Sequence, residues 1–346
     1  MNSSPPVDFR SDTVTKPSAA MRAAMAEAIV GDDVFGEDET INSLQAETAK
    51  LLGKQAGLFV PSGTMGNQLA IKAQTEPGNE IICEADSHIR YYEAGGAAFN
   101  SGVQLCALRG KRGALTARQV EDAIQPDDVH SAPTALVTLE NTHNRAGGSI
   151  IPLDNIVAIG EVAKRHKLAL HLDGARLMNA VVASGIDAKT WAEPFDTVSI
   201  CFSKGLGAPV GSVLCGSVEL IKKAHRYRKI FGGGMRQAGI IAAGALYALQ
   251  HHVADLKFDH DRAQLLALAL SEYAAVKIDP TEVQTNIVIF GMEPGTLAAQ
   301  EVEQKLLDEG VLMLALGPQL LRLVTHRDLT DSDIDRALTA FRKVFA

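Results

Sequence analysis

Residues 168–173 read LALHLD, and residues 197–204 read TVSICFSK. Each stretch is a short, nearly continuous apolar run that ends at or near a charged residue, Asp173 in the first and Lys204 in the second. Such runs are typical of strands buried on both faces, as in a mainly parallel sheet covered by helices. Sheets of this kind bind ligands at the carboxyl ends of their strands. The two stretches therefore predict an α/β fold with a functional site at one edge of the sheet.

The same pattern recurs along most of the chain. Amphipathic segments at 116–124 and 154–166 predict helices, the second with Asp154 as its N-cap. No GxGxxG string opens a helix, so a dinucleotide-binding fold is not favoured. The alternation of strands and helices predicts a sheet with helices on both faces. The remaining strands of this sheet are predicted at 57–60, 80–83, 103–108, 135–139 and 211–215.

The last third of the chain changes in character. We therefore predict two domains: a large domain of residues 1–252, which includes the N-terminal segment, and a smaller α+β domain of residues 253–346. Thr330 or Asp331 is expected to cap the final helix. In this part of the chain, helices are predicted at 238–256, 262–273 and 331–345, and strands at 286–290 and 320–325.

Composition excludes several classes of protein. Lys and Arg number 33 and Asp and Glu 41, so the net charge is −8, and the basic excess typical of nucleic-acid binding is missing. The longest apolar stretch, residues 240–249, is shorter than the ~20 residues that span a bilayer. The start, MNSSPPVDFRSD, lacks the pattern of a secretory signal. Scattered cysteines without a CxxC pair favour reduced thiols in the cytoplasm over a metal site: Cys83, Cys106, Cys201 and Cys215.

Lys204 and Asp173 together suggest a particular chemistry. A lysine at the end of a buried strand loses hydration, which favours the neutral amine that attacks carbonyl groups and forms Schiff bases. A strand-end carboxylate is the partner that the ring nitrogen of pyridoxal phosphate requires. Taken singly, Lys204 could extend its amine to solvent and Asp173 could cap the following helix.

Other residues add to this pattern. Ser62-Gly63-Thr64 connects a predicted strand to a helix, a position where backbone amides bind phosphate. His88, His130 and His143 are candidates for stacking on a ring or moving a proton. Arg322 lies in the apolar run LLRLVTH and needs an anion, either an internal carboxylate or the carboxylate of a substrate.

In combination, these motifs resemble those of the L-threonine aldolases, a family of pyridoxal-phosphate enzymes of fold type I. The resemblance extends from about residue 8 to the C-terminus, and several motifs occur in the family's order. They are DFRSDTVTKPS (8–18), VGDDVFGED (30–38), FVPSGTMGN (59–67), LENTHN (139–144), HLDGARL (171–177), SKGLGAPVGS (203–212), GGGMRQ (232–237) and RLVTH (322–326).

The resemblance implies a role for each matching residue. Lys204 would bind pyridoxal 5′-phosphate covalently, Asp173 would pair with its ring nitrogen, and His88 would stack on the ring. Ser62, Gly63, Thr64 and Ser203 would lie at the phosphate, which Lys229 and Arg236 would approach from a neighbouring subunit of a homotetramer. Arg176 would contribute to cofactor binding. Substrate carboxylate would be held by Ser11, Arg176 and Arg322.

The implied reaction is retro-aldol cleavage of L-threonine or L-allo-threonine to glycine and acetaldehyde, with low specificity for the β-carbon. His88 and His130 together are expected to act on the β-hydroxyl proton, although a water relay is an alternative. Another pyridoxal-phosphate lyase or an aminotransferase is the second reading. A binding protein that has lost catalysis is a third, which nothing in the sequence favours.

Overall fold

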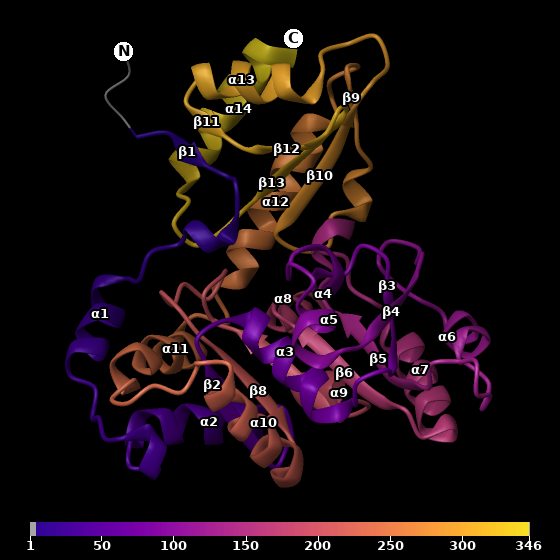
Figure 1. Ribbon diagram of the computed structural model, residues 1–346. Helices are drawn as coiled ribbons and strands as arrows, with labels where there is room; N and C mark the ends of the chain where they lie inside the picture. The colour runs from indigo at the N-terminus through magenta and orange to yellow at the C-terminus, as the bar shows by residue number, and fades with distance from the viewer. Residues whose placement is uncertain (1–4, 346) are drawn as a thin grey trace.

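The computed structural model describes residues 5–345 (Figure 1). Residues 1–4, part of the segment interpreted as lacking a secretory signal, and Ala346 lie outside that range. The main sheet has seven strands in the order β2-β8-β7-β6-β5-β3-β4, and only β8 runs against the others. The predicted mainly parallel sheet is therefore confirmed. Its strands are β2 (Ala56–Val60), β3 (Glu80–Glu84), β4 (Gln104–Leu108), β5 (Thr134–Glu140), β6 (Ala169–Gly174), β7 (Thr197–Cys201) and β8 (Ser212–Gly216).

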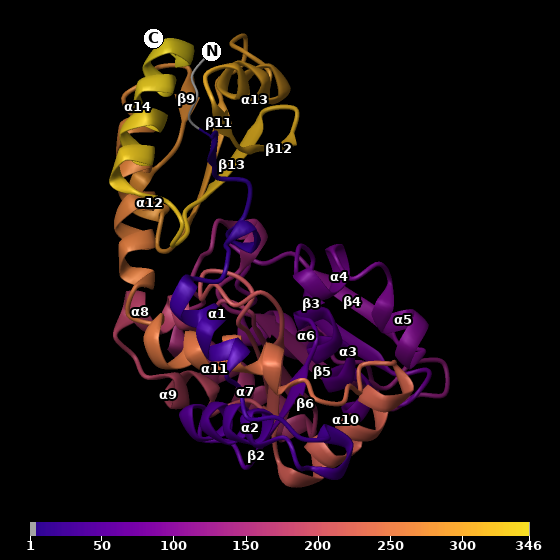
Figure 2. The same ribbon diagram turned by 90° about the vertical axis from the view of Figure 1, so that its left-hand side faces the viewer.

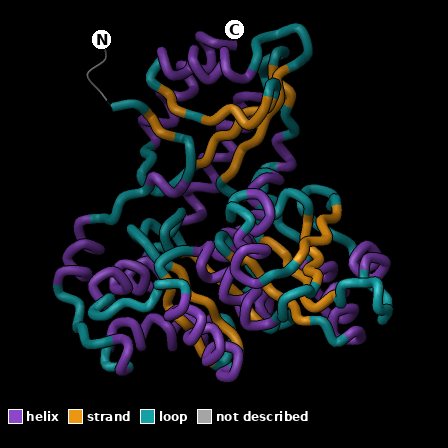
Figure 3. Tube along the Cα trace, viewed as in Figure 1, coloured by secondary structure: helices purple, strands orange, loops and turns teal. Residues whose placement is uncertain are grey.

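Both faces of this sheet are buried, as the apolar runs predict. In β2, Phe59 packs into the largest core cluster, while Leu58 and Val60 point the other way and pack with α3 and α10. Figure 3 shows these strands enclosed by helices, with a second group of strands above them. The helices on the Phe59 side include α2 (Glu39–Leu51), α7 (Leu153–His166), α8 (Leu177–Ser184), α9 (Ala188–Ala192) and α11 (Gly239–His251). On the other side are α3 (Gly63–Gln74), α5 (Gly96–Ser101) and α10 (Val218–Ile230).

A second, antiparallel sheet forms the small domain. Its order is β12-β13-β10-β9, and helices cover one of its faces (Figure 2). The boundary near residue 253 precedes α12, whose Leu256 packs in the large domain's core and whose Ala263 packs in the small domain's core. The helices are α12 (Leu256–Leu270), α13 (Ala299–Asp308) and α14 (Asp331–Phe345), and the strands are β9 (Val276–Lys277), β10 (Ile287–Met292), β12 (Leu314–Gly317) and β13 (Leu320–Val324).

Residues 7–9 lie in the small domain, although the predicted boundaries placed residues 1–252 in the large domain. Strand β1 (Val7–Asp8) pairs in parallel with β11 (Val311–Leu312). Val7 and Phe9 are almost fully buried in the small domain's core. The chain then crosses to the large domain, where it forms α1 (Ala19–Ala26). Sequence patterns could not place this segment, because its strand has two residues and its partner is distant.

The helix boundaries follow local capping chemistry. The Ser62 hydroxyl accepts from the amide of Met65, and Thr116 forms a capping box with Gln119 before α6 (Ala117–Ala123). Thr330 is a cap of α14, as predicted, because its hydroxyl accepts from the Asp333 amide. The prediction that Asp154 caps α7 is wrong: Pro152 is the N-cap, and Asp154 lies in the first turn. Within residues 5–345, no helix combines the length and apolarity needed to cross a membrane.

Close packing between β6 and β7 generates a test of the fold. A Cβ added at Gly174 would lie 2.7 Å from the carbonyl oxygen of Ser199, too close for either backbone to stay in place. We expect Gly174→Ala to lower the free energy of unfolding by about 1–3 kcal/mol. Gly317→Ala is the matched control, because a Cβ there has no heavy atom within 4 Å. Denaturant titration measures both variants, and equal stabilities would contradict this account.

Candidate active site

Three neighbouring parallel strands end at one edge of the main sheet, and polar groups gather there. Glu140 ends β5, Asp173 lies opposite it in β6, and Lys204 follows β7 by three residues. The carbonyl oxygen of Lys204 accepts hydrogen bonds from Thr15 Oγ1 (2.9 Å) and from the amide of Gly207 (2.8 Å). These bonds fix the turn that carries the lysine. Within residues 5–345, no hydrogen bond or ion pair engages the Lys204 amine.

Asp173 is buried but remains an anion. Its Oδ2 accepts from Asn67 Nδ2 at 2.7 Å, and its Oδ1 accepts from the Ala175 amide at 3.1 Å. Burial would raise the pKa of Asp173, but the positive charges of His88 and Lys204 hold it below its ordinary value. A buried, ionised carboxylate at this position fits the expected partner of a protonated ring nitrogen better than a simple helix cap.

The orientation of Asn67 follows from its neighbours. Its Nδ2 donates one hydrogen to Asp173 and the other to Glu93 Oε1 (2.7 Å), so its Oδ1 faces His171 Nε2 at 3.1 Å. Burial lowers the pKa of His171 to about 4, so this ring is neutral near pH 7. Its single proton is therefore on Nε2, donated to Asn67, and its Nδ1 accepts from Thr197 Oγ1 (2.9 Å).

Glu93 is a site residue that the sequence analysis missed. Its side chain is fully buried, and Oε1 lies 2.8 Å from His88 Nδ1 while Oε2 accepts from Gln68 Nε2 at 2.6 Å. Burial would lower the pKa of His88, but the hydrogen bond to Glu93 and the charge of Asp173 raise it. The sequence held one indication of a buried polar partner. Asn67 and Gln68 are adjacent polar residues in the helix expected after Ser62-Gly63-Thr64, and both are buried in α3.

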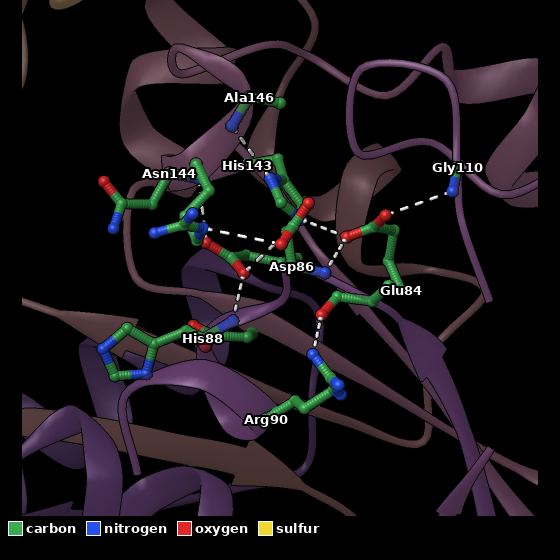
Figure 4. A network of polar contacts seen from close by, with 12 residues as sticks. Glu84, Asp86, His88, Arg90, Gly110, His143, Asn144 and Ala146 are labelled. Carbon is green, nitrogen blue, oxygen red and sulfur yellow. Dashed lines mark hydrogen bonds and ion pairs between the residues drawn. The ribbon is translucent and has the colours of Figure 1, made fainter. Parts of the chain in front are cut away.

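A second polar network lies beside His88 (Figure 4). Glu140 accepts from the amides of His88 (2.7 Å) and Asn144 (2.9 Å), so it anchors both segments. His143 Nε2 lies 3.1 Å from Glu84, and its Nδ1 accepts from the amide of Ala146. While Nδ1 accepts from the Ala146 amide, the ring proton is on Nε2; burial would lower the pKa of His143, but Glu140 and Glu84 raise it.

Within the single chain, His130 does not lie at this site, so its own His88 and His130 do not come together as predicted. It lies exposed in the loop before β5, whereas the site lies at the other end of that seven-residue strand. At about 3.3 Å per residue, this strand alone separates the two by roughly 20 Å. The histidine that the fold brings to the site is His143, which follows β5.

The three residues predicted to bind carboxylate have different environments. Arg322 is 8% exposed and has no carboxylate partner within residues 5–345: it donates to Asn144 Oδ1 (3.2 Å) and to the carbonyl oxygen of Arg10 (3.0 Å). The neighbouring Ser11 hydroxyl accepts from Thr13. Arg176 instead makes two 2.7 Å bonds to Asp12, which lower the pKa of that carboxyl to about 2 although burial would raise it. Asp12 is thus the internal partner of Arg176, and the sequence analysis did not identify it.

The first turn of α3 meets the requirements for a phosphate. Ser62 caps the helix, and the amides of Gly63 and Thr64 have no acceptor within the described residues. Gly63 lies against β7 and β8, since a Cβ on it would be 3.5 Å from Cys201 Sγ and Ser212 Oγ. Ser203 lies on the same side, with its hydroxyl 3.5 Å from Cys201 Sγ. Free amides at a helix N-terminus favour an anion.

Lys229 and Arg236 are exposed on the single chain. Lys229 is near the end of α10, and Arg236 pairs with Asp32 at 2.9 Å. The buried cation in this region is Arg228, which the sequence analysis missed and which binds Asp33 (2.6 Å) and the carbonyl oxygen of Phe59.

Comparison with known proteins agrees with this arrangement. The model of the beta-eliminating lyase family matches residues 8–293. Low-specificity L-threonine aldolase 1 of Arabidopsis thaliana is 42% identical over 97% of this chain and 96% of its own length. Low specificity L-threonine aldolase of Escherichia coli K12 is 42% identical over 98% of this chain and 99% of its own. A solved Leishmania major threonine aldolase has the same fold, with a TM-score of 0.84 at 19% identity over 99% and 100% of the two chains. The chain therefore belongs to the beta-eliminating lyase family, among the L-threonine aldolases of fold type I.

Proposed function

We propose that this protein is a pyridoxal-phosphate-dependent L-threonine aldolase that cleaves L-threonine and L-allo-threonine to glycine and acetaldehyde. The observation that carries the proposal is the pairing, at adjacent strand ends, of an unengaged lysine, Lys204, with a buried anionic carboxylate, Asp173. Relatives at about 42% identity over nearly the full length have this activity in their names. Cleavage of L-threonine without an added keto acid distinguishes it from an aminotransferase.

The residues present fit pyridoxal phosphate. Lys204 supplies the amine for covalent attachment, Asp173 an anion for the ring nitrogen, and His88 a flat ring at the site wall, 25% exposed. The amides of Gly63 and Thr64 supply donors for the phosphate, with Ser62 and Ser203 nearby. When bound, this cofactor withdraws electrons from the α-carbon of an attached amino acid.

Arg322 orients the substrate. A guanidinium that is buried without a counter-anion binds a carboxylate strongly, and two parallel hydrogen bonds fix the carboxylate's plane. This in turn determines which bond at the α-carbon is placed for cleavage. Arg176, already paired with Asp12, acts mainly by holding the segment that contains Ser11 beside Arg322.

His88 is the group best placed to exchange the β-hydroxyl proton. Glu93 engages Nδ1, so proton transfer falls to Nε2. His143 has no free nitrogen, because Nε2 is bonded to Glu84 and Nδ1 accepts a backbone hydrogen. If His88 is the one side chain that contacts the β-hydroxyl, the enzyme accepts substrates of either β-carbon configuration.

The active unit is a homotetramer built from dimers. Lys229 and Arg236 are exposed on one chain and lie around the Gly232–Gly234 turn, so they are available to a neighbouring subunit's phosphate. The four cysteines are free thiols, which supports a reducing, cytoplasmic location.

Lys204→Ala tests the cofactor attachment. We expect the variant to lose the visible absorbance of bound pyridoxal phosphate and at least ~10³-fold in turnover, because no second amine replaces the nucleophile. Lys223→Ala on the exposed face of α10 is the control and should behave as wild type. Unchanged absorbance in Lys204→Ala would refute the assignment.

Arg322→Ala separates carboxylate binding from structural support. Because no carboxylate loses a partner, we expect a melting temperature near that of wild type and a KM for L-threonine raised roughly 10–100-fold. Arg322→Lys should restore little, since an ammonium lacks the planar two-donor geometry. Arg176→Ala is the contrasting variant: it leaves Asp12 buried and unpaired, at a cost of about 3–5 kcal/mol. Early melting of Arg322→Ala with a normal KM would contradict the carboxylate-binding role.

The oligomer is tested by light scattering together with cofactor titration. We expect a tetramer, and we expect Lys229→Ala and Arg236→Ala each to weaken pyridoxal-phosphate affinity without lowering thermal stability. The weaker binding reflects the loss of a cation near the phosphate. A fully active monomer would overturn this part of the proposal.

A further inference from the structure

A second arginine near the site, Arg145, has a carboxylate neighbour, Asp86, but makes no hydrogen bond to it. Arg145 lies in a short 3-10 turn, η3 (Asn144–Ala146), and its side chain is 21% exposed. Its guanidinium stacks on Tyr91 at 3.8 Å from the ring centroid, and Nη1 donates to the Tyr92 hydroxyl at 3.1 Å. Asp86 forms an ion pair with Nε at 3.6 Å, which is longer than a hydrogen bond. Of the five donors of a guanidinium, one therefore makes a hydrogen bond within the described part of the chain, and the buried Nε has the ion pair with Asp86 but no hydrogen bond.

The turn that carries Arg145 is held in place from both sides. The amide of His143 donates to the Ser149 carbonyl (2.9 Å), which closes the turn. Gly147 and Gly148 have positive φ values of 78° and 66°, which reverse the chain after the arginine. The Gly148 carbonyl accepts from Thr285 Oγ1 at 2.7 Å. The guanidinium is thus presented on a fixed support.

Two contacts connect Arg145 to the site. The Tyr92 ring lies 5.5 Å from the His88 ring and 5.9 Å from the Arg145 guanidinium. Asn144, the residue before Arg145, accepts from Arg322. Burial and the charge of Arg176 lower the pKa of Arg322, and the charge of Arg145 lowers it as well. Arg145 is therefore close enough to Arg322 for their charges to interact.

We propose that Arg145 forms a second carboxylate subsite, which selects β-hydroxy-α-amino acids whose β-substituent carries a carboxylate, such as L-3-hydroxyaspartate. This inference rests on the proposed function. With Arg322 at the α-carboxylate, Arg145 lies across Tyr92 from His88, the group assigned to the β-hydroxyl, and the donors that Asp86 does not engage are available to the part of a substrate beyond its β-carbon. A carboxylate suits them better than a methyl group, because a planar guanidinium binds it with two hydrogen bonds.

The reaction is the same cleavage with a different aldehyde. In 3-hydroxyaspartate the Cα–Cβ bond breaks, the β-hydroxyl loses its proton and becomes an aldehyde carbonyl, and Cα takes up a proton. The products are glycine and glyoxylate, with no oxidant or reductant.

Binding of two unreactive ligands tests the subsite without turnover. L-Aspartate and L-alanine differ by one β-carboxylate, and neither has a β-hydroxyl to cleave. By calorimetry on the cofactor-loaded protein, we expect L-aspartate to bind about tenfold more tightly, as one partly exposed charge-assisted pair provides. Arg145→Met should abolish this preference. Arg109→Met is the matched control. Arg109 also pairs with Asp86 (3.8 Å), but it follows the edge strand β4 and its side chain is 86% exposed.

Wild-type protein that binds the two ligands equally would overturn the inference, whether or not Arg145→Met folds. So would a preference for L-aspartate that persists in Arg145→Met, or one that Arg109→Met removes equally.

Glycine formation from 3-hydroxyaspartate and L-threonine completes the test. We expect the ratio of their kcat/KM values to fall about tenfold in Arg145→Met and to stay constant in Arg109→Met. If wild type prefers phenylserine and Arg145→Met keeps that preference, Tyr91 and Tyr92 rather than Arg145 contact the β-substituent. That result would contradict the inference. If wild type forms no glycine from L-threonine, the proposed function itself fails, which is a distinct result.

Discussion

The side-chain amide of Asn67 lies between two buried carboxylates, and the geometry of the candidate site depends on it. Its two hydrogens go to Asp173 and Glu93, and its oxygen accepts from His171. Without this amide, two acidic groups would face each other in a space shielded from water, and one of them would take up a proton. Because His171 is neutral, it adds no charge of its own and serves only to hold the amide in one orientation. Asp173 can therefore remain ionised while Glu93 holds His88.

The buried arginines divide into two groups with different consequences. Arg176 and Arg228 are paired with Asp12 and Asp33 at 2.6–2.7 Å, and each connects segments far apart in the chain. Such pairs are costly to break, because removing one partner leaves a buried charge. Arg322 instead has only neutral acceptors. A protein retains a desolvated cation of that kind at a cost in stability, which a bound anion offsets. The presence or absence of a carboxylate partner thus separates the arginines that support the fold from the one that we propose binds the substrate.

Much of the fold and part of the site could be predicted from the sequence. The strands ending near Asp173 and Lys204 were identifiable because burial on both faces requires apolar residues at every position. The position of His130 could also have been recognised from the sequence, since His130 precedes the strand predicted at 135–139 and the site lies at the carboxyl ends of the strands. Glu93 and Asp12 were missed because their partners, Asn67 and Arg176, are distant in the chain and only the fold brings them together. The site residues identified were those next to strands, and the rest required the tertiary structure.

The pairing of β1 with β11 has a consequence for how the protein is made. Val311, the partner of Val7, is synthesised roughly 300 residues after it, so the contact is among the most non-local in the described part of the chain. Ser11 and Asp12 follow β1 directly, and Asp12 must reach Arg176 inside the large domain. The nascent chain can therefore build the main sheet early, as domains generally fold in order of synthesis. The corner proposed to bind substrate has to wait until β1 is paired with β11.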